Sequence, residues 1–214
     1  MNLLIYTDPQ GSDAWLAARR GVITASRFKD CRDKLKGGKP SQKCIAYAMD
    51  KARERVGGEP MKVFENAAMR FGTEQEPLAR AAYEMRTKQF VEEAGFITTE
   101  DGLFGVSVDG LVGDDGIIEI KTMVSSDTLF TAVVDEDISA YIDQCNGAMW
   151  LLDRQWVDLV LWAPDLTDIG RQLTIIRINR DTDAIEALEK DLVEFERMVT
   201  KYQQALSRKL KEAA

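Results

Sequence analysis

Short apolar stretches, several of them alternating with polar positions at a period of two, predict about five β-strands. These stretches are Phe90 to Thr99, Phe104 to Leu111, Ile117 to Met123, Val157 to Trp162 and Leu173 to Ile178. Two segments with helical spacing, Asp127 to Val134 and Ala140 to Leu152, lie between the third and fourth stretches and are long enough for a crossover. The pattern predicts an α/β (α+β) fold in which helices flank a central mixed β-sheet.

Capping and breaker residues place further helices before these strands. We expect helices from Ser12 to Gly21, from Thr24 or Ser26 onward, from Ser41 to Val56, and from Phe64 to Lys88 with interruptions around Gly72 and Pro77. Glu74 and Glu76 precede Pro77, where acids favour the start of a helix.

The last helix is expected from Thr182 to Lys211, where Asp183 and Glu186 have the spacing of a capping box. Its apolar positions recur every three or four residues: Ile185, Leu188, Leu192, Phe195, Val199, Tyr202, Leu206 and Leu210. This stripe packs on the same domain, on a partner, or on both. We expect one domain over residues 1–214, made of a basic helical part (1–60), a core (64–180) and a C-terminal helix (181–214).

Composition restricts the chemistry. The 214 residues are 45% hydrophobic, enough for a sizeable core, and contain three widely spaced cysteines, which fit neither a disulfide framework nor a zinc site. The chain has no histidine, which excludes the usual serine or cysteine triads, histidine-ligated zinc and histidine general bases. No run is long enough to span a membrane and no secretory leader is visible, so we expect a cytoplasmic protein.

The net charge of −8 argues against a nucleic-acid partner, but its distribution does not. Residues 19–55 contain twelve Lys and Arg against four Asp and Glu, whereas residues 100–137 contain ten acids and one base. Such segregation can present a basic surface to DNA beside an acidic metal site.

The acidic stretch from Val106 to Lys121 holds the candidate chemistry. In a strand, Glu119 and Lys121 share one face while Ile120 points into the core. A hairpin with its turn at Gly113 to Gly116 would bring Asp109 beside that face. Carboxylates placed together favour Mg²⁺ or Mn²⁺, and a lysine there could orient or deprotonate a water. The alternative is a solvated surface hairpin.

A second candidate site lies near the N-terminus. A helix beginning at Thr24 or Ser26, with Arg19 nearby, would bind a phosphate through its free N–H groups. Alternatively, Thr24 and Ser26 only cap the helix and Arg19 is a solvated charge. The basic loop from Lys34 to Pro40 either lies beside a DNA end or is solvated.

These motifs together resemble the lambda exonuclease family, also called YqaJ-type viral recombinases, over about residues 10–162. The resemblance begins with Gln10-Gly11-Ser12-Asp13-Ala14-Trp15 and continues through Arg19, Gly21, Ile23-Thr24-Ala25-Ser26, Glu76, Asp109 to Lys121, and Gln144 in a helix ending at Trp150. One departure is Val108, which stands where the superfamily has a proline.

The resemblance implies a PD-(D/E)xK nuclease that digests one strand of linear duplex DNA from 5′ to 3′, starting at a 5′-phosphorylated end. It implies that Asp109, Glu119, the Ile120 carbonyl and Glu76 hold two Mg²⁺, for which Mn²⁺ can substitute, and that Lys121 is catalytic with Gln144 in support. Residues 19, 24 and 26 would bind the terminal phosphate.

The resemblance also implies partners that the residues do not reveal. These are a ring-shaped homotrimer and a single-strand annealing protein that uses the 3′ tail for recombination. Two other functions stay open: a sequence-specific or structure-specific endonuclease of the same superfamily, and a non-catalytic module that binds DNA ends.

Overall fold

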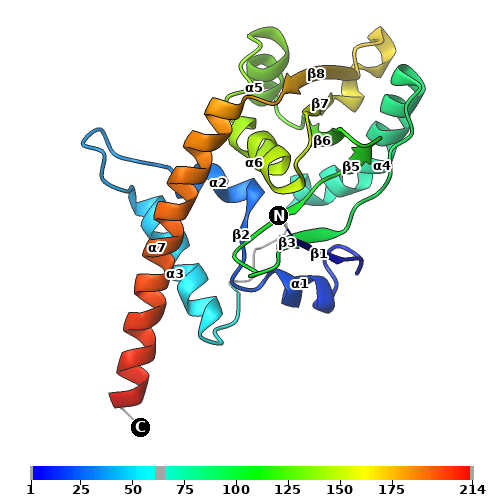
Figure 1. Cartoon of the computed structure of the whole chain (residues 1–214). Helices are drawn as coiled ribbons and strands as arrows, with labels where there is room; N and C mark the ends of the chain where they lie inside the picture. The colour runs from blue at the N-terminus through cyan, green and yellow to red at the C-terminus, as the bar shows by residue number, and fades with distance from the viewer. Residues whose placement is uncertain (1, 61–65, 213–214) are drawn as a thin grey trace. The chain divides into compact units, whose positions relative to one another are not determined.

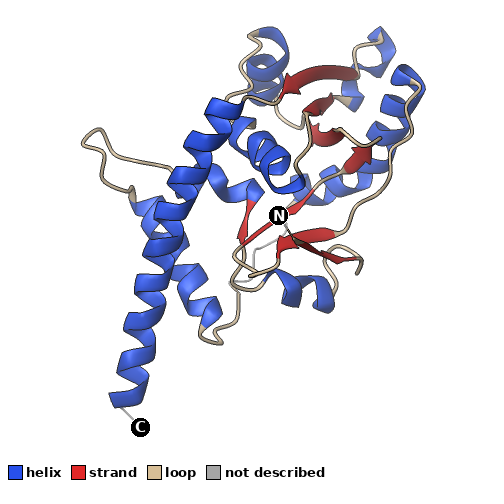
Figure 2. Ribbon diagram, viewed as in Figure 1, coloured by secondary structure: helices blue, strands red, loops and turns tan. Residues whose placement is uncertain are grey.

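In the part of the chain that the structure describes, eight strands form two four-stranded mixed sheets flanked by helices (Figures 1 and 2). The structure is a computed structural model that describes residues 2–60 and 66–212, with side chains described through residue 208. The predicted α+β class is therefore confirmed, with two sheets in place of one. The chain divides into a first unit (Met1–Lys62, Gly95–Ser107, Asp181–Ala214) and a second unit (Val63–Ala94, Val108–Arg180).

The first unit contains the sheet with strand order β1-β3-β4-β2. Its strands are β1 (Leu3–Tyr6), β2 (Ile23–Thr24), β3 (Phe96–Thr99) and β4 (Phe104–Ser107). Its helices are α1 (Asp13–Arg19), the 3-10 helix η1 (Ala25–Arg27), α2 (Phe28–Cys31), α3 (Gln42–Arg55) and α7 (Thr182–Glu212). Strand β2 runs parallel to β4, whereas β3 is antiparallel to both of its neighbours.

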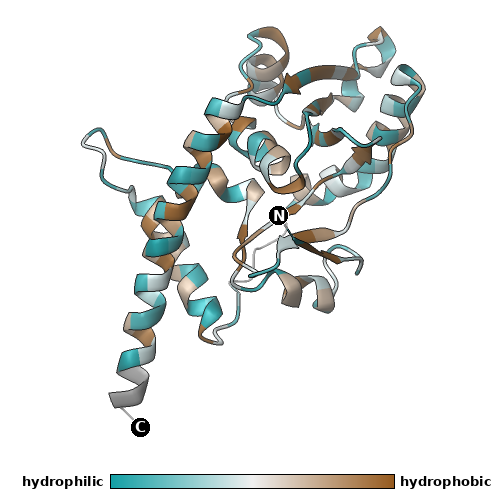
Figure 3. Ribbon diagram, in the orientation of Figure 1, coloured by the Kyte–Doolittle hydropathy of each residue, from teal (hydrophilic) through white to brown (hydrophobic). Residues whose placement is uncertain are grey.

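Helix α7 packs along α3 through its apolar stripe. The first five stripe residues, Ile185 to Val199, are at most 3% exposed, and the Phe195 and Tyr47 rings stack at 5.4 Å. The helix alternates between apolar and polar residues along its length (Figure 3). The side chain of Leu210 lies outside the described residues. The capping residue is Asp181, whose carboxylate accepts the Ala184 N–H at 3.0 Å, and not the predicted Asp183.

The second unit contains the sheet with strand order β5-β6-β7-β8. Its strands are β5 (Gly110–Val112), β6 (Gly116–Thr122), β7 (Trp156–Trp162) and β8 (Leu173–Asn179). Strands β6 and β7 are parallel, so the predicted crossover between them is confirmed. It is made of α5 (Ser126–Leu129), the π-helix η2 (Phe130–Val134) and α6 (Ile142–Leu152); the 3-10 helix η3 (Pro164–Ile169) follows β7.

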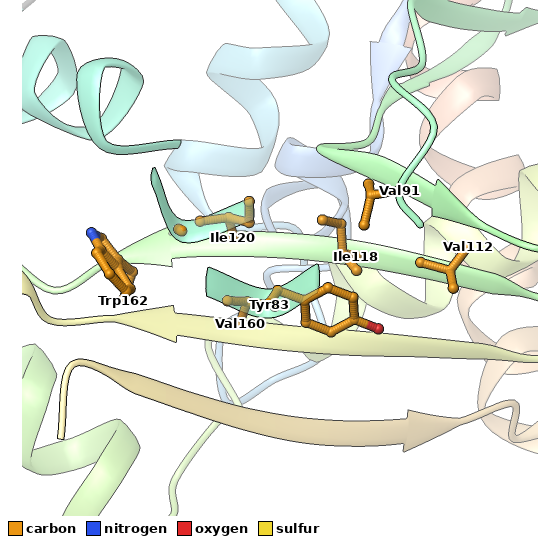
Figure 4. Packing of buried hydrophobic residues seen from close by; sticks show 8 residues of the cluster. Tyr83, Val91, Val112, Ile118, Ile120, Val160 and Trp162 are labelled. Carbon is orange, nitrogen blue, oxygen red and sulfur yellow. The ribbon is translucent and has the colours of Figure 1, made fainter. Parts of the chain in front are cut away.

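Helix α4 (Ala67–Thr87) covers part of the second sheet. Its Tyr83 packs with Ile118, Ile120 and Val160 of β6 and β7 in a buried cluster (Figure 4). The predicted interruptions at Gly72 and Pro77 are wrong, because tertiary packing carries the helix through both. Phe64, where the helix was predicted to begin, lies outside the described residues.

The predicted strand from Phe104 to Leu111 is two strands in different sheets. Strand β4 ends at Ser107 and pairs with β3 and β2, whereas β5 begins at Gly110 and pairs with β6. The hairpin therefore exists, but its first strand is Gly110–Val112. The predicted strand from Phe90 is also shorter, since β3 begins at Phe96.

No helix in the described ranges is both long enough and apolar enough to cross a lipid bilayer.

Candidate active site

Strand β6 presents Glu119 and Lys121 on one face. Lys121 Nζ donates to Glu119 Oε1 at 2.7 Å, while Ile120 between them points into the core and is 8% exposed. Glu119 is itself only 3% exposed, although a carboxylate is costly to bury without a partner. The period of two along the strand thus pairs a buried acid with a half-buried base on one face, and the shared face is as the sequence predicted.

Asp109 occupies the break between β4 and β5. Its Oδ2 accepts the backbone N–H of Ile120 at 2.6 Å, which holds the carboxylate beside β6. Burial raises the pKa of Asp109 well above its ordinary value, the negative charges of Glu119 and Glu76 raise it further, and the hydrogen bond from Ile120 opposes them. A cation among these acids would relieve the repulsion.

Helix α6 supplies a third contact to this group. Gln144 donates from Nε2 to Glu119 Oε1 and accepts from Lys121 Nζ at 3.2 Å, so its amide bridges the pair. The ring of Tyr141 lies 5.9 Å from Lys121 Nζ. Burial alone would lower the pKa of Lys121, but the adjacent carboxylate of Glu119 outweighs it and raises that pKa. Lys121 is thus held as a cation.

Glu76 lies on α4 and forms an ion pair with Arg80 of the same helix. Its Oε1 accepts from Arg80 Nη2 at 2.7 Å, and Arg80 also pairs with Glu93. Burial raises the pKa of Glu76 against the opposing effect of Arg80, and the charge of Glu119 raises it further. Sequence reasoning missed Arg80, although its spacing of four residues from Glu76 is typical of a helical ion pair.

The donor set fits a hard divalent cation. Carboxylates and a backbone carbonyl are the ligands that Mg²⁺ and Mn²⁺ prefer, and Asp109 has no basic side chain in hydrogen-bond contact within the described ranges. Over those same ranges, no three acidic or cysteine side chains converge tightly enough to form a ready-made metal cluster. The charges of Glu119 and of Glu76 both act on Asp109, so all three carboxylates are candidate ligands.

Arg19, at the end of α1, is half-buried and packs against two aromatic rings of the first unit. Its guanidinium lies 4.2 Å from the Trp15 ring centroid and 4.9 Å from that of Phe96, and its Nη1 donates to Ser107 Oγ at 3.3 Å. Burial lowers its pKa from the ordinary value. Arg19 is therefore not the solvated surface charge of the alternative reading. Ser107 was missed because nothing in its local sequence distinguishes it.

Thr24 and Ser26 lie together, but not at the start of a long helix. Their hydroxyls are 3.4 Å apart, and the Thr24 N–H donates to the Tyr47 hydroxyl at 3.3 Å. The predicted helix consists of η1, three residues long, and α2, four residues long, and neither hydroxyl caps them. The prediction of a capped helix with a dipole is wrong, because neither short helix has a side-chain cap or enough turns. The guanidinium and the hydroxyls remain candidate groups for binding a phosphate.

Comparison with known proteins places this geometry in context. Residues 14–155 match the profile of the YqaJ-like viral recombinase domain. The chain is 35% identical to an alkaline exonuclease (LHK-Exo) from Laribacter hongkongensis, with 95% of this chain and 100% of that one covered and a TM-score of 0.83. The same exonuclease in complex with dAMP gives 36% identity, coverage of 95% and 100%, and a TM-score of 0.82.

A phage-related exonuclease from Haemophilus somnus 129PT shares the fold at 18% identity, with 88% of this chain and 96% of that one covered and a TM-score of 0.69. Among curated protein sequences, no significant match is found.

Proposed function

The chain belongs to the YqaJ-like viral recombinase family, and from this membership we propose that it is a divalent-metal-dependent DNA exonuclease. The observation that carries the proposal is the network of Asp109, Glu119, Lys121 and Gln144 around β6. It assembles acidic oxygens, a cation and an orienting amide in a protein without histidine. The similarity to LHK-Exo, an alkaline exonuclease, supports the same activity.

The acids would hold the metal. Asp109, Glu119 and the Ile120 carbonyl would be its ligands together with Glu76, for two Mg²⁺ ions that Mn²⁺ can replace. When bound, these ions supply an activated water and neutralise the charge that develops on the scissile phosphate.

The remaining residues orient the reaction. Lys121 positions the attacking water, and Gln144 holds Lys121 and Glu119 in register through its two amide atoms. The water oxygen bonds to phosphorus as the bond from phosphorus to the 3′ oxygen breaks, so the shortened strand keeps a 5′-phosphate for the next cycle. Arg80 restrains Glu76.

The end of the DNA would be read in the first unit. Arg19 supplies a half-buried guanidinium, with hydroxyls from Thr24, Ser26 and Ser107. Charge-assisted hydrogen bonds of this kind favour a terminal phosphate, which carries more charge than an internal diester. We extend the proposal to 5′-to-3′ digestion that leaves a 3′ single-stranded tail.

We base the wider assignment on what the resemblance to the lambda exonuclease family implies. The whole chain, residues 1–214, would act as one nuclease domain in the cytoplasm, assemble as a ring-shaped homotrimer, and hand its 3′ tail to a single-strand annealing protein. Light scattering on purified protein tests the trimer, which requires three times the chain mass.

The activity is tested with one linear duplex labelled at either the 5′ or the 3′ end, and with a closed circular duplex of the same sequence. We expect Mg²⁺-dependent release of the 5′ label as mononucleotide, retention of the 3′ label until late, and an intact circle. Cutting of the circle would indicate an endonuclease. Binding of linear ends without any release in Mg²⁺ or Mn²⁺ would indicate a non-catalytic module.

A further inference from the structure

Helix α3 holds the backbone of the short segment between Arg19 and Ser26 by three side chains. Glu54 Oε2 accepts the N–H of Gly21 at 2.8 Å, and Arg55 Nε donates to the carbonyl of the same residue at 2.8 Å. The Tyr47 hydroxyl accepts the N–H of Thr24. Both polar groups of Gly21 are therefore occupied by side chains of one helix, which is a stronger constraint than a turn makes on its own.

The approach at Gly21 leaves no room for a side chain. Its φ is +74°, and a Cβ there would lie 2.7 Å from Arg55 Cγ. Positive φ with a close neighbour favours glycine strongly. The backbone between Arg19 and Ser26 thus packs closely against α3 at Gly21, and contacts with that helix fix its conformation there.

Glu54 and Arg55, which we call the Gly21 clamp, are themselves held by further contacts. Glu54 is 6% exposed and also accepts from Lys51 Nζ at 2.7 Å. Arg55 Nη1 donates to Glu196 of α7 at 2.6 Å, and the Thr200 hydroxyl donates to the same carboxylate oxygen at 2.9 Å. Supported side chains of this kind lose little further entropy in holding one backbone geometry. Helices α3 and α7 lie side by side in Figure 1.

The residue that the clamp holds, Gly21, lies in the sequence between the residues that would bind the phosphate. Arg19 is two residues before Gly21 and Thr24 is three residues after it, and the Val22 N–H returns to the Arg19 carbonyl at 3.2 Å. A shift of the Gly21 peptide therefore changes the separation between the Arg19 guanidinium and the hydroxyls of Thr24 and Ser26. A misplacement of about 1 Å can cost about a hundredfold in rate.

We propose that Glu54 is a positioning residue for DNA-end recognition, which fixes the Gly21 peptide and thereby the spacing of the phosphate-binding groups. The inference rests on the proposed reading of the terminal phosphate by Arg19. Glu54 touches neither DNA nor the acids of β6 in this assignment. It acts through the backbone alone.

The experiment measures the ratio of digestion rates on 5′-phosphorylated and 5′-hydroxyl ends of one duplex, for wild type, Glu54→Ala, Glu54→Asp and Glu54→Gln. Glu54→Ala removes the acceptor of the Gly21 N–H, and Glu54→Asp withdraws it by one methylene. Each should lower the ratio about tenfold, while the rate on hydroxyl ends changes less than about twofold. Glu54→Gln keeps an acceptor oxygen and should retain most of the ratio. Circular dichroism and thermal unfolding identify the folded variants.

Asp191→Asn is the matched control, because it weakens partly exposed ion pairs between α7 and the segment before α3 but leaves the clamp intact. If Glu54 has a purely structural role, the digestion rates on both kinds of end fall equally and their ratio stays constant, as in the control. That result in a folded Glu54→Ala or Glu54→Asp variant overturns the inference and leaves the proposed function standing. A wild-type ratio of one instead overturns the phosphate reading itself, and the inference with it. Should Glu54→Ala fail to fold, Glu54→Asp decides.

Discussion

At the scale of single residues, several acidic groups of the second unit are buried close to one another, although their negative charges repel. Asp109 has a raised pKa because of burial and the charges of Glu119 and Glu76. Such an arrangement costs stability in the absence of a cation and is typical of sites that bind one. Three predictions belong to this scale.

Asp109→Asn and Glu119→Gln each remove one charge at almost constant volume. Nucleotide release should fall by about a hundredfold to a thousandfold, because each lost carboxylate weakens the stabilisation of transition-state charge. DNA binding in EDTA should persist. The melting temperature of Asp109→Asn in EDTA should equal or exceed that of wild type, since the substitution relieves repulsion. Near-normal turnover at saturating Mg²⁺ would contradict the metal assignment.

Lys121→Ala should lose its activity in the chemical step. Its ammonium bridges Glu119 and Gln144, so its removal should slow single-turnover cleavage by about a hundredfold to ten-thousandfold while the Kd for DNA changes little. Lys121→Arg should rescue poorly, because the planar guanidinium has a different shape and hydrogen-bond geometry. Wild-type single-turnover rates in the arginine variant would show that only the positive charge matters.

Arg19→Ala should weaken digestion from phosphorylated ends by roughly tenfold to a hundredfold, since a charge-assisted hydrogen bond contributes about 1.5 to 3 kcal/mol. The effect on hydroxyl ends should be small. Wild type and variant, each measured on both ends, form a double-mutant cycle that separates the contact from a general loss of stability. Simple additivity would mean that Arg19 does not contact the phosphate.

At the scale of elements, the first unit is held together by ion pairs between its basic N-terminal part and α7. Asp191 accepts from Arg32 Nε at 3.0 Å and from Lys34 Nζ at 2.8 Å. Burial alone would raise the pKa of Asp191, but the hydrogen bonds from Lys34 and Arg32 outweigh it and lower that pKa.

Asp191→Asn should therefore be less stable than wild type in a pH-dependent way. A carboxylate with a lowered folded pKa contributes stability above its ordinary pKa of about 3.9, and the contribution is lost as pH falls through the lower folded value. Both partners are partly exposed, so the difference at pH 7 should be about 1 kcal/mol. Urea unfolding at pH 7 and near pH 3 measures it. A difference that persists unchanged at the lower pH would exclude this linkage.

At the scale of the whole molecule, pairing reduces the basic surface that the sequence suggested. Arg32, Lys34, Lys51 and Arg55 all contact carboxylates within the first unit. Among the described residues that remain exposed and without an ion pair are Lys36 and Lys39 of the loop before α3. These lysines are the better candidates for contacts with DNA phosphates.

Replacing Lys36 and Lys39 together by alanine should weaken binding of linear duplex and lower the slope of log Kd against log salt by roughly one per lysine. Fluorescence anisotropy in EDTA at several salt concentrations measures this slope. Lys201→Ala, on an exposed position of α7, serves as the control and should leave the slope unchanged. An unchanged slope in the double variant would mean that the loop is only solvated.

Local geometry explains what the sequence by itself determined. The period of two in β6 placed Glu119 and Lys121 together and buried Ile120, and the 3.6-residue period of α7 identified its buried stripe. The absence of histidine limited the chemistry to carboxylates and lysine. These features depend on residues a few positions apart, whose relative directions follow from the backbone alone.

Contacts between distant segments decided the rest. The chain leaves one sheet at Ser107 and enters the other at Gly110, because each half-strand finds a different partner, and no local pattern marks that break. Arg19 is half-buried against the rings of Trp15 and the distant Phe96. Gly21 is held by Glu54 and Arg55 of α3, more than thirty positions later. Burial and hydrogen-bond partners of this kind depend on which surfaces the packed chain brings together, and only the tertiary structure contains that information.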